Sequence, residues 1–374
     1  MGWIQSISDN ISVVDAEGNA VIPGFVDSHT HLIWSGDRSN EMALRQNGLS
    51  YTEISQMGGG ISKTVRSTRK CTFEELVNIG TNNAKKALML GTTTLEAKSG
   101  YGLNLESEIA ILSAYQLVNS RSNCDIHSTW LGAHDFPTNT TREDYIDELI
   151  HKQLPEVCRL GIARWADVFC EPGWFTVDES KEILLASNKL GLRPRAHVDE
   201  FVDSNGLAMA ADIGCVSADH VACSSDDARS KADAAGVMQT FLPGTQYVMG
   251  MIDFPPMKSC LENSWAFSIA SDFNPNCNSI SMPFVGSLAT HRCGIDPIAA
   301  LVASTRNPAT TFSDGEPPGC GSLTEGGNAS LNILTTNSVE GWCQSPGMNP
   351  ISLTISNGNI AVSYTHLTLP TTGV

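Results

Sequence analysis

The feature that most constrains the fold is an alternation of short β-rich runs with helical stretches, which continues through most of the chain. Helix caps stand at the junctions, where such an alternation requires them. The clearest predicted helix is bounded by a capping box of Thr72 and Glu75 and by a C-terminal stop at Gly91. A second helix, between residues 176 and 191, begins and ends in the same way. The pattern is therefore a repeated βα unit.

Eight of the β-rich runs are predicted strands. They span residues 24–31, 92–98, 125–131, 165–170, 193–197, 216–219, 237–242 and 266–271. Eight strands separated by helices favour the α/β class and a closed parallel (β/α)8 barrel of the TIM type, because a doubly wound open sheet usually has fewer strands. With 374 residues and 41% hydrophobic composition, the chain is long enough for such a barrel, which needs roughly 250 residues.

Both ends of the chain differ from the middle. Residues 1–23 and 322–363 contain short predicted strands and turns with no helices between them, which indicates a small β-sandwich subdomain beside a barrel of residues 24–321. Residues 364–374 have neither periodicity nor turn signals. We expect this atypical tail to be either disordered or foreign to the native gene.

Charge and hydropathy exclude several classes of partner. A net charge of −17 repels phosphate backbones and anionic lipid, so we expect no nucleic-acid partner and no membrane partner. No run approaches the ~20 apolar residues that a bilayer requires, and the first ten residues do not resemble a secretion signal. Eleven cysteines without a CxxC pair are typical of reduced thiols. These features predict a soluble, cytoplasmic protein.

The histidines carry the strongest chemical signal. Successive side chains on a strand alternate between its faces, so Asp27, His29 and His31 share one face and the two imidazoles can bind one ion. The alternative is that paired histidines only cap a strand end. Three further histidines and one aspartate argue against this alternative, because they lie at or just past the ends of other predicted strands: His134, His197, His220 and Asp272. In a barrel these ends meet at one mouth, where active sites are built.

The residue types fit a hydrolase with a single metal ion. The expected metal ligands are His29, His31, His197 and Asp272. Such an ion lowers the pKa of a bound water from ~15.7 toward ~7. Glu200, three residues after His197, is close enough to exchange protons with this water, although an acid in a loop can also be merely solvated. His220 could donate to the oxygen that becomes negative during attack.

Loops after the predicted strands suggest a small anionic substrate. Arg38 could hold a carboxylate, whereas an exposed loop arginine usually only solvates. Three more polar or aromatic side chains lie in predicted loops of this kind: Tyr51, Tyr101 and Asn274. The glycines at 58–60 do not form a phosphate loop and predict a lid or a plain turn. The remaining histidines are not expected to bind a metal: His127, His151, His291 and His366.

Taken in order, PGFVDSHTH, GDRSNE, GGGISKTVRSTR, TTLEAKSGYGL, LGAHDFP, HVDE, SADH and SDFNPN resemble the imidazolonepropionases of the amidohydrolase superfamily, over residues 21–335. The resemblance implies that the metal, divalent or trivalent, is zinc or iron, and that Glu200 is the proton shuttle. It implies that His220 stabilises the attacked carbonyl and that Asp272 belongs to the catalytic group as well as to the ligands. The implied substrate-binding residues are Arg38, Tyr51, Tyr101, His134 and Asn274.

The implied reaction is hydrolysis of a ring C–N bond in 4-imidazolone-5-propanoate, giving N-formimino-L-glutamate in histidine degradation. Members of the family are generally homodimers. Binuclear relatives in the superfamily carry a modified lysine at the end of the fourth barrel strand, where this chain has Val168 to Glu171, so one metal is favoured. The segment before PGFVDSHTH is shorter than in the family, which suggests truncation.

Two other functions compete with this interpretation. Another amidohydrolase, such as a deaminase or a cyclic-imide hydrolase, shares the metal ligands but not the mouth loops. Arg38 and Tyr101 favour the imidazolonepropionase interpretation over a deaminase, because a neutral base has no carboxylate for these residues to bind. A metal-binding barrel without catalysis is the second alternative, and Glu200 and His220 argue against it because a mere binding site needs no proton shuttle.

Overall fold

The computed structural model describes residues 13–313 and 319–363, and within them eight parallel strands form a barrel. The strand order follows the sequence, from β2 to β9, as expected for repeated βα units. The barrel strands are β2 (Phe25–Asp27), β3 (Thr92–Lys98), β4 (Asp125–Ala133), β5 (Trp165–Cys170), β6 (Arg193–Val198), β7 (Ser217–His220), β8 (Met238–Phe241) and β9 (Phe267–Ile269). The predicted (β/α)8 fold is confirmed.

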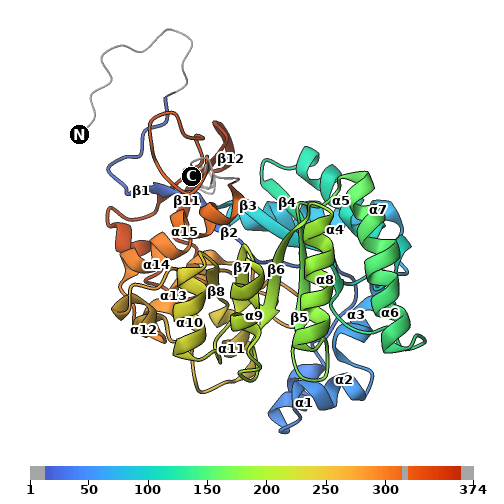
Figure 1. Cartoon of the computed structure of the whole chain (residues 1–374). Helices are drawn as coiled ribbons and strands as arrows, with labels where there is room; N and C mark the ends of the chain where they lie inside the picture. Colours follow the sequence, from blue (N-terminus) through green and yellow to red (C-terminus); the bar gives the residue numbers. More distant parts are fainter. Residues whose placement is uncertain (1–12, 314–318, 364–374) are drawn as a thin grey trace.

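Helices surround the barrel (Figure 1). They are α1 (Glu41–Gln46), α2 (Tyr51–Gln56), α3 (Gly60–Thr68), α4 (Phe73–Met89), α5 (Leu105–Arg121), α6 (Arg142–Glu148), α7 (Leu154–Leu160), α8 (Val177–Lys189), α9 (Gly206–Ile213), α10 (Asp226–Ala234), α11 (Pro243–Met249), α12 (Met257–Glu262), α13 (Met282–His291), α14 (Pro297–Ala303) and α15 (Arg306–Ala309). Short π and 3-10 turns add η1 (Leu149–Gln153), η2 (Thr310–Phe312) and η3 (Val339–Trp342). The capping box predicted at Thr72 and Glu75 is present at the start of α4, and α8 begins with the same motif.

The barrel closes where its first and last strands meet. Thr30 and Phe273 form a parallel bridge just beyond the ends of β2 and β9. The amide of Ser271 donates to Asp27 Oδ1 over 3.0 Å, and the amide of Asp272 donates to the carbonyl of His29 over 3.1 Å. These bonds place the beginning and the end of the barrel sequence side by side at the mouth.

A small antiparallel sheet joins segments from both ends of the described chain. Its order is β1 (Val21–Pro23), β10 (Leu331–Leu334), β11 (Ile351–Ser356) and β12 (Asn359–Ser363). Figure 1 shows this sheet at one end of the barrel and α1 and α2 at the other. The predicted β subdomain is therefore present, whereas its division from the barrel after residues 23 and 321 remains a prediction. The expected truncation of the N-terminal segment stays a prediction, and the atypical tail of residues 364–374 lies outside the described residues.

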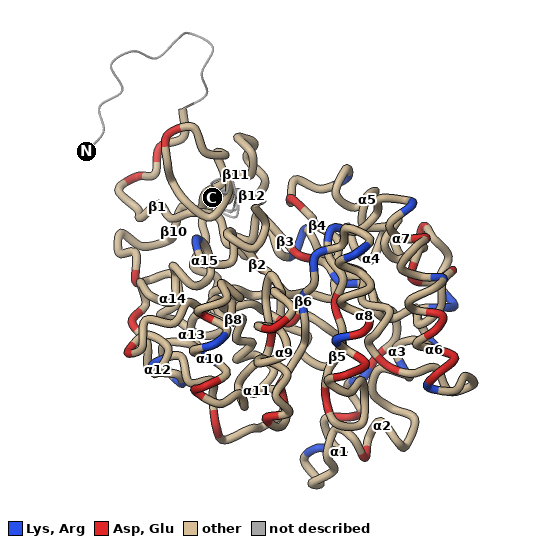
Figure 2. Tube along the Cα trace, in the orientation of Figure 1, with Lys and Arg blue, Asp and Glu red and all other residues tan. Residues whose placement is uncertain are grey.

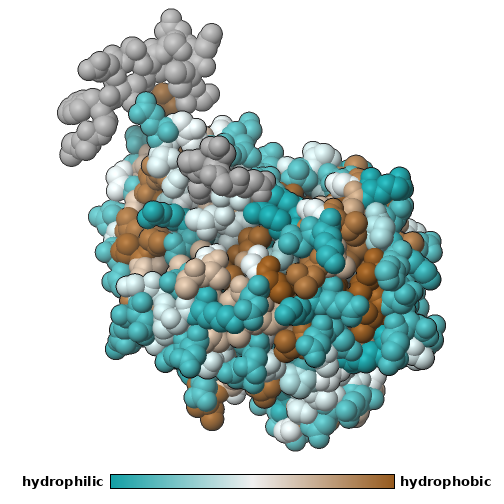
Figure 3. All heavy atoms as spheres, viewed as in Figure 1, coloured by the Kyte–Doolittle hydropathy of each residue, from teal (hydrophilic) through white to brown (hydrophobic). Residues whose placement is uncertain are grey.

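Charged residues of both signs lie along the described chain. Figure 2 shows basic residues scattered among acidic ones, in keeping with the net charge of −17. On the face seen in Figure 3, hydrophobic residues are dispersed between hydrophilic ones. No described helix has the length and apolar character needed to cross a bilayer. All eleven cysteines lie within the described residues and are free.

Trp342 anchors the C-terminal segment to the barrel. Its side chain is fully buried, its ring centroid lies 5.2 Å from that of Phe25 in β2, and its indole nitrogen donates to the carbonyl of Pro297 over 2.9 Å. A Cβ on Gly286 would overlap the Trp342 ring, so only glycine leaves room for this packing. The small sheet is therefore connected to the barrel by a continuous apolar contact.

We predict that Trp342→Ala lowers the free energy of unfolding by ~3–5 kcal/mol, because it leaves a cavity between the barrel and the C-terminal segment. Urea denaturation followed by circular dichroism measures the loss. Trp265→Ala, at a half-buried position, is the matched control and should cost less. An equal or smaller loss for Trp342→Ala would show that this contact does not stabilise the fold.

Candidate metal centre

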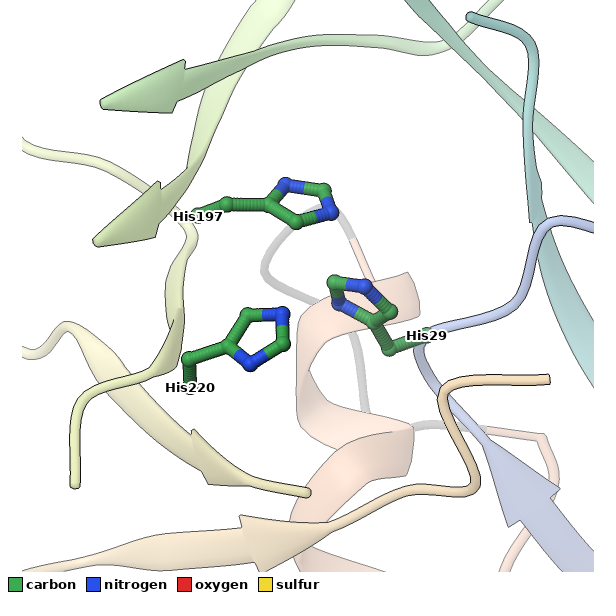
Figure 4. A group of neighbouring side chains, drawn as sticks. All are labelled: His29, His197 and His220. Atoms are coloured by element: carbon green, nitrogen blue, oxygen red, sulfur yellow. The ribbon is translucent and has the colours of Figure 1, made fainter. Parts of the chain in front are cut away.

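The predicted metal ligands come from strand ends at the barrel mouth. His29 and His31 follow β2, His197 lies in β6, and Asp272 follows β9. His220 is the last residue of β7. Figure 4 shows His29, His197 and His220 projecting from three separate segments with their rings turned toward one another. The parallel barrel therefore brings together residues that are up to 243 positions apart in the sequence (272 − 29).

The distances between donor atoms fit one ion. His29 Nε2 lies 3.5 Å from Asp272 Oδ1, and His31 Nε2 lies 3.8 Å from the same oxygen. His31 Nε2 and His197 Nε2 are 3.5 Å apart. Ligand atoms bound at ~2.1 Å in tetrahedral directions are about 3.4 Å apart. Because His29 Nε2 is also buried without a hydrogen-bond partner, these residues fit a divalent metal ion.

Two groups of three side chains at this centre are close enough to hold a metal ion, and they share His29. One contains His29, His31 and Asp272, and the other contains His29, His197 and His220. The predicted ligand set takes residues from both and leaves out His220, whose Nδ1 faces Glu200 Oε2 at 3.7 Å. His220 and Asp272 both have left-handed backbone angles, with φ of 73° and 51°. Non-glycine residues rarely adopt this conformation, and it is concentrated at functional sites.

Buried carboxylates support two of the histidines, and the sequence analysis did not identify them. His29 Nδ1 lies 2.7 Å from Asp219 Oδ2, and His197 Nδ1 lies 3.1 Å from Asp167 Oδ2. The carboxylate that hydrogen-bonds His29 Nδ1 fixes the tautomer in which Nε2 carries a free lone pair, and the carboxylate of Asp167 lies beside the same atom of His197. The available signal was the presence of acidic residues inside predicted buried strands.

Burial controls the protonation of the site. It lowers the pKa of His29, His31 and His220 well below the ordinary value, and the neighbouring cationic groups add to this effect. These imidazoles are therefore neutral, as metal binding requires. Burial also raises the pKa of Glu200 well above its ordinary value, and Asp272 and Glu171 contribute to the increase.

The predicted substrate-binding residues line the same cavity as the metal centre. These side chains surround a small cavity that is partly open at the barrel mouth. Its walls include Arg38, Tyr51, Tyr101, His134, Asn274, Glu200 and His220. The structure thus brings every predicted site residue together at the mouth, while the role of each remains a prediction.

Arg38 is held in this wall by a partner that the sequence analysis missed. Glu41 Oε2 accepts from Arg38 Nε over 2.9 Å and lies 2.9 Å from Nη2, and both side chains are buried. Glu41 Oε1 also accepts from the amide of Gly60 over 3.0 Å. The glycines at 58–60 accordingly form a turn into α3. Arg38 also lies over the Tyr51 ring, 5.5 Å from its centroid.

The histidines that were not expected to bind metal lie elsewhere. His127 is in β4 and pairs with Asp125 at 3.0 Å. His151 and His291 are on exposed helical surface. His366 is outside the described residues.

Comparison with known proteins defines the class. A sequence model of the amidohydrolase family matches residues 12–78. The 5-methylcytosine deaminase of Klebsiella pneumoniae has a similar structure, with a TM-score of 0.72, 17% identity, and coverage of 99% of this chain and 93% of that one. A zinc-bound adenosine deaminase of Xanthomonas campestris gives a TM-score of 0.67 at 16% identity, covering 92% and 81%. At these identities the likeness shows the fold alone. Fold, family model and site together define an amidohydrolase.

Full-length relatives define the family. The imidazolonepropionase of Symbiobacterium thermophilum is 40% identical over 94% of this chain and 83% of that protein. The imidazolonepropionase of Haloarcula marismortui is 37% identical over the same shares. This chain belongs to the imidazolonepropionase family.

We predict that His220→Asn keeps its metal and loses turnover, whereas His197→Ala loses the metal. The reason is that Nδ1 of His220 faces Glu200, whereas Nε2 of His197 lies beside Nε2 of His31, another predicted metal ligand. Elemental analysis after dialysis measures the metal content, and His127→Ala is the matched control that should retain it. If His220→Asn loses as much metal as His197→Ala, His220 is a ligand and the assignment is wrong.

Proposed function

We propose that this chain is an imidazolonepropionase that hydrolyses 4-imidazolone-5-propanoate to N-formimino-L-glutamate in histidine degradation. The observation that carries the proposal is a buried arginine in the same cavity as four convergent metal donors and a buried glutamate. The arginine suits an anionic side chain, and the donors and the glutamate suit hydrolysis of a cyclic amide. Membership of the family supports the same substrate.

His29, His31, His197 and Asp272 are the residues that would hold the metal. A donor set of imidazoles and one carboxylate suits zinc or iron. When bound, the ion supplies Lewis-acid activation of water and of the substrate carbonyl.

Glu200 is placed to move the proton. Its side chain is almost fully buried, and Glu171 accepts a hydrogen bond from its backbone amide. We assign Glu200 to take a proton from the attacking water and to deliver it to the ring nitrogen that leaves. The water oxygen forms a bond to the carbonyl carbon, the C–N bond breaks, and the nitrogen keeps the bonding electrons and gains the proton. His220, 3.7 Å from Glu200, stabilises the negative charge on the carbonyl oxygen.

Arg38 is placed to bind the propanoate group. Burial lowers the pKa of Arg38, but Tyr51 and Glu41 outweigh it and hold the pKa above the ordinary value, so the side chain stays cationic. Tyr51 and Tyr101 line the cavity beside it, and His134 stacks on His31 with ring centroids 5.0 Å apart. Asn274 lines the wall near the loop that carries Asp272. We assign these groups to the substrate.

A deaminase with the same metal ligands is the main alternative. Its neutral base substrates would offer no carboxylate to Arg38, whose guanidinium lines the cavity beside its pair with Glu41. We further propose that the enzyme is a cytoplasmic homodimer, and the family resemblance supports this assignment.

We predict that Glu200→Gln binds metal normally and lowers kcat ~10²–10⁴-fold, because an amide cannot transfer the proton. Stopped assays of ring opening and metal analysis on the same sample measure the two effects separately. Glu106→Gln, at an exposed position of α5, is the control and should be fully active. Near-normal kcat for Glu200→Gln would place the shuttle elsewhere.

We predict that Arg38→Met lowers kcat/KM for imidazolonepropanoate by the equivalent of ~2–5 kcal/mol, since a buried charge loses its partner. An analogue without the carboxylate should be a poor substrate for the wild type and lose little more in the variant. Arg121→Met removes an exposed arginine paired with Glu74 and should leave kcat/KM unchanged.

Two results would reject the substrate assignment. One is equal turnover of the acid by the wild type and Arg38→Met. The other is a preference of the wild type for neutral aminopyrimidines or aminopurines. Neither result would remove the metal centre, so the class of hydrolase is tested separately from its substrate.

A further inference from the structure

A fully buried lysine lies beneath the metal centre. Lys98 is the last residue of β3, and its ammonium group contacts three carboxylates that are also fully buried. Lys98 Nζ lies 2.8 Å from Glu96 Oε1, 2.6 Å from Asp167 Oδ2 and 3.5 Å from Asp219 Oδ2. These carboxylates come from β3, β5 and β7, so the lysine connects alternate strands across the inside of the barrel.

Two of these carboxylates also contact predicted metal ligands, and they do so through the same oxygen atoms. Asp219 Oδ2 lies 2.7 Å from His29 Nδ1, and Asp167 Oδ2 lies 3.1 Å from His197 Nδ1. Each connection therefore runs from the ammonium through one carboxylate oxygen to an imidazole, whose Nε2 faces the metal centre. One lysine supports both histidines.

Electrostatics explains why a cation is required there. Three carboxylates in the barrel interior repel one another and have lost their hydration, so without a counter-charge their side chains turn away from one another. That movement removes the carboxylate oxygens that lie beside Nδ1 of the two histidines. Burial lowers the pKa of Lys98, but Asp167, Glu96 and Asp219 outweigh it and hold the pKa above the ordinary value.

We propose that Lys98 is a positioning residue for the metal centre, which holds Asp167 and Asp219 in the orientation that presents His29 and His197 to the ion. The proposal rests on the proposed function, because it takes these histidines as metal ligands. Lys98 differs from the bridging lysine of binuclear relatives, since its ammonium is occupied by three carboxylates. It acts through them and touches no substrate.

The test compares Lys98→Met with Arg195→Met. Arg195 is an equally buried cation in β6, but its guanidinium contacts Ser217, Thr311 and the Trp165 ring. Both metal-free variants should be less stable to urea than the wild type. The affinity for Zn²⁺ alone, measured by competition with a chromophoric chelator, should fall ~10–100-fold in Lys98→Met and stay unchanged in Arg195→Met.

A double-mutant cycle separates positioning from general destabilisation. Asp219→Asn should weaken Zn²⁺ binding in the wild type but cost less in the Lys98→Met background, because both substitutions act on the same connection. Full additivity would overturn the proposal. If Lys98→Met does not fold, Lys98→Gln takes its place in both experiments with the same expectation, since the amide carries no charge.

The outcomes distinguish the proposal from the proposed function. If the wild type binds no Zn²⁺, the metal-hydrolase assignment fails and the positioning role fails with it. If the wild type binds Zn²⁺ and the Lys98 variant binds it as tightly, only the positioning role is overturned. The same conclusion follows if Arg195→Met loses as much affinity as the Lys98 variant.

Discussion

The closure of the barrel between its first and last strands is the constraint on which the site depends. His29 and Asp272 are held together by a backbone hydrogen bond of 3.1 Å before any side chain is considered. That bond places a histidine from the first strand and an aspartate from the last within 3.5 Å of each other. A sheet left open at this edge would separate His29 from Asp272. The metal centre therefore depends on closure of the barrel.

A second constraint follows from putting so much charge inside a barrel. Barrel interiors are normally filled with branched apolar side chains, whereas here Glu96, Lys98, Asp167 and Asp219 are fully buried. Isolated charges in such a place are costly, and they are tolerated when they are paired and hydrogen-bonded. The pairing also has a use, since the same carboxylates orient His29 and His197. The same contacts therefore stabilise the buried charges and orient the predicted metal ligands.

The barrel and the positions of the predicted metal ligands could be predicted from the sequence, because they follow from the order of strands and helices along the chain. Strand alternation places His29 and His31 on one face, and parallel strands send their C-terminal ends to one mouth. The contacts of Glu41 with Arg38, of Asp167 with His197 and of Asp219 with His29 could not be predicted. Each depends on how loops and neighbouring strands are aligned in three dimensions, which the sequence pattern does not give. Whether Arg38 is buried or solvated stayed open for the same reason: a charged residue in a loop resembles a solvated one until the loop packs against the mouth.

We expect ring opening to need both the metal centre and an anionic substrate. The most direct measurement is the formation of N-formimino-L-glutamate from 4-imidazolone-5-propanoate by the purified chain, first stripped of metal and then reloaded with Zn²⁺ or Fe²⁺. We expect product only after reloading. Equal product formation by the stripped protein, or none after reloading with either ion, would contradict this expectation.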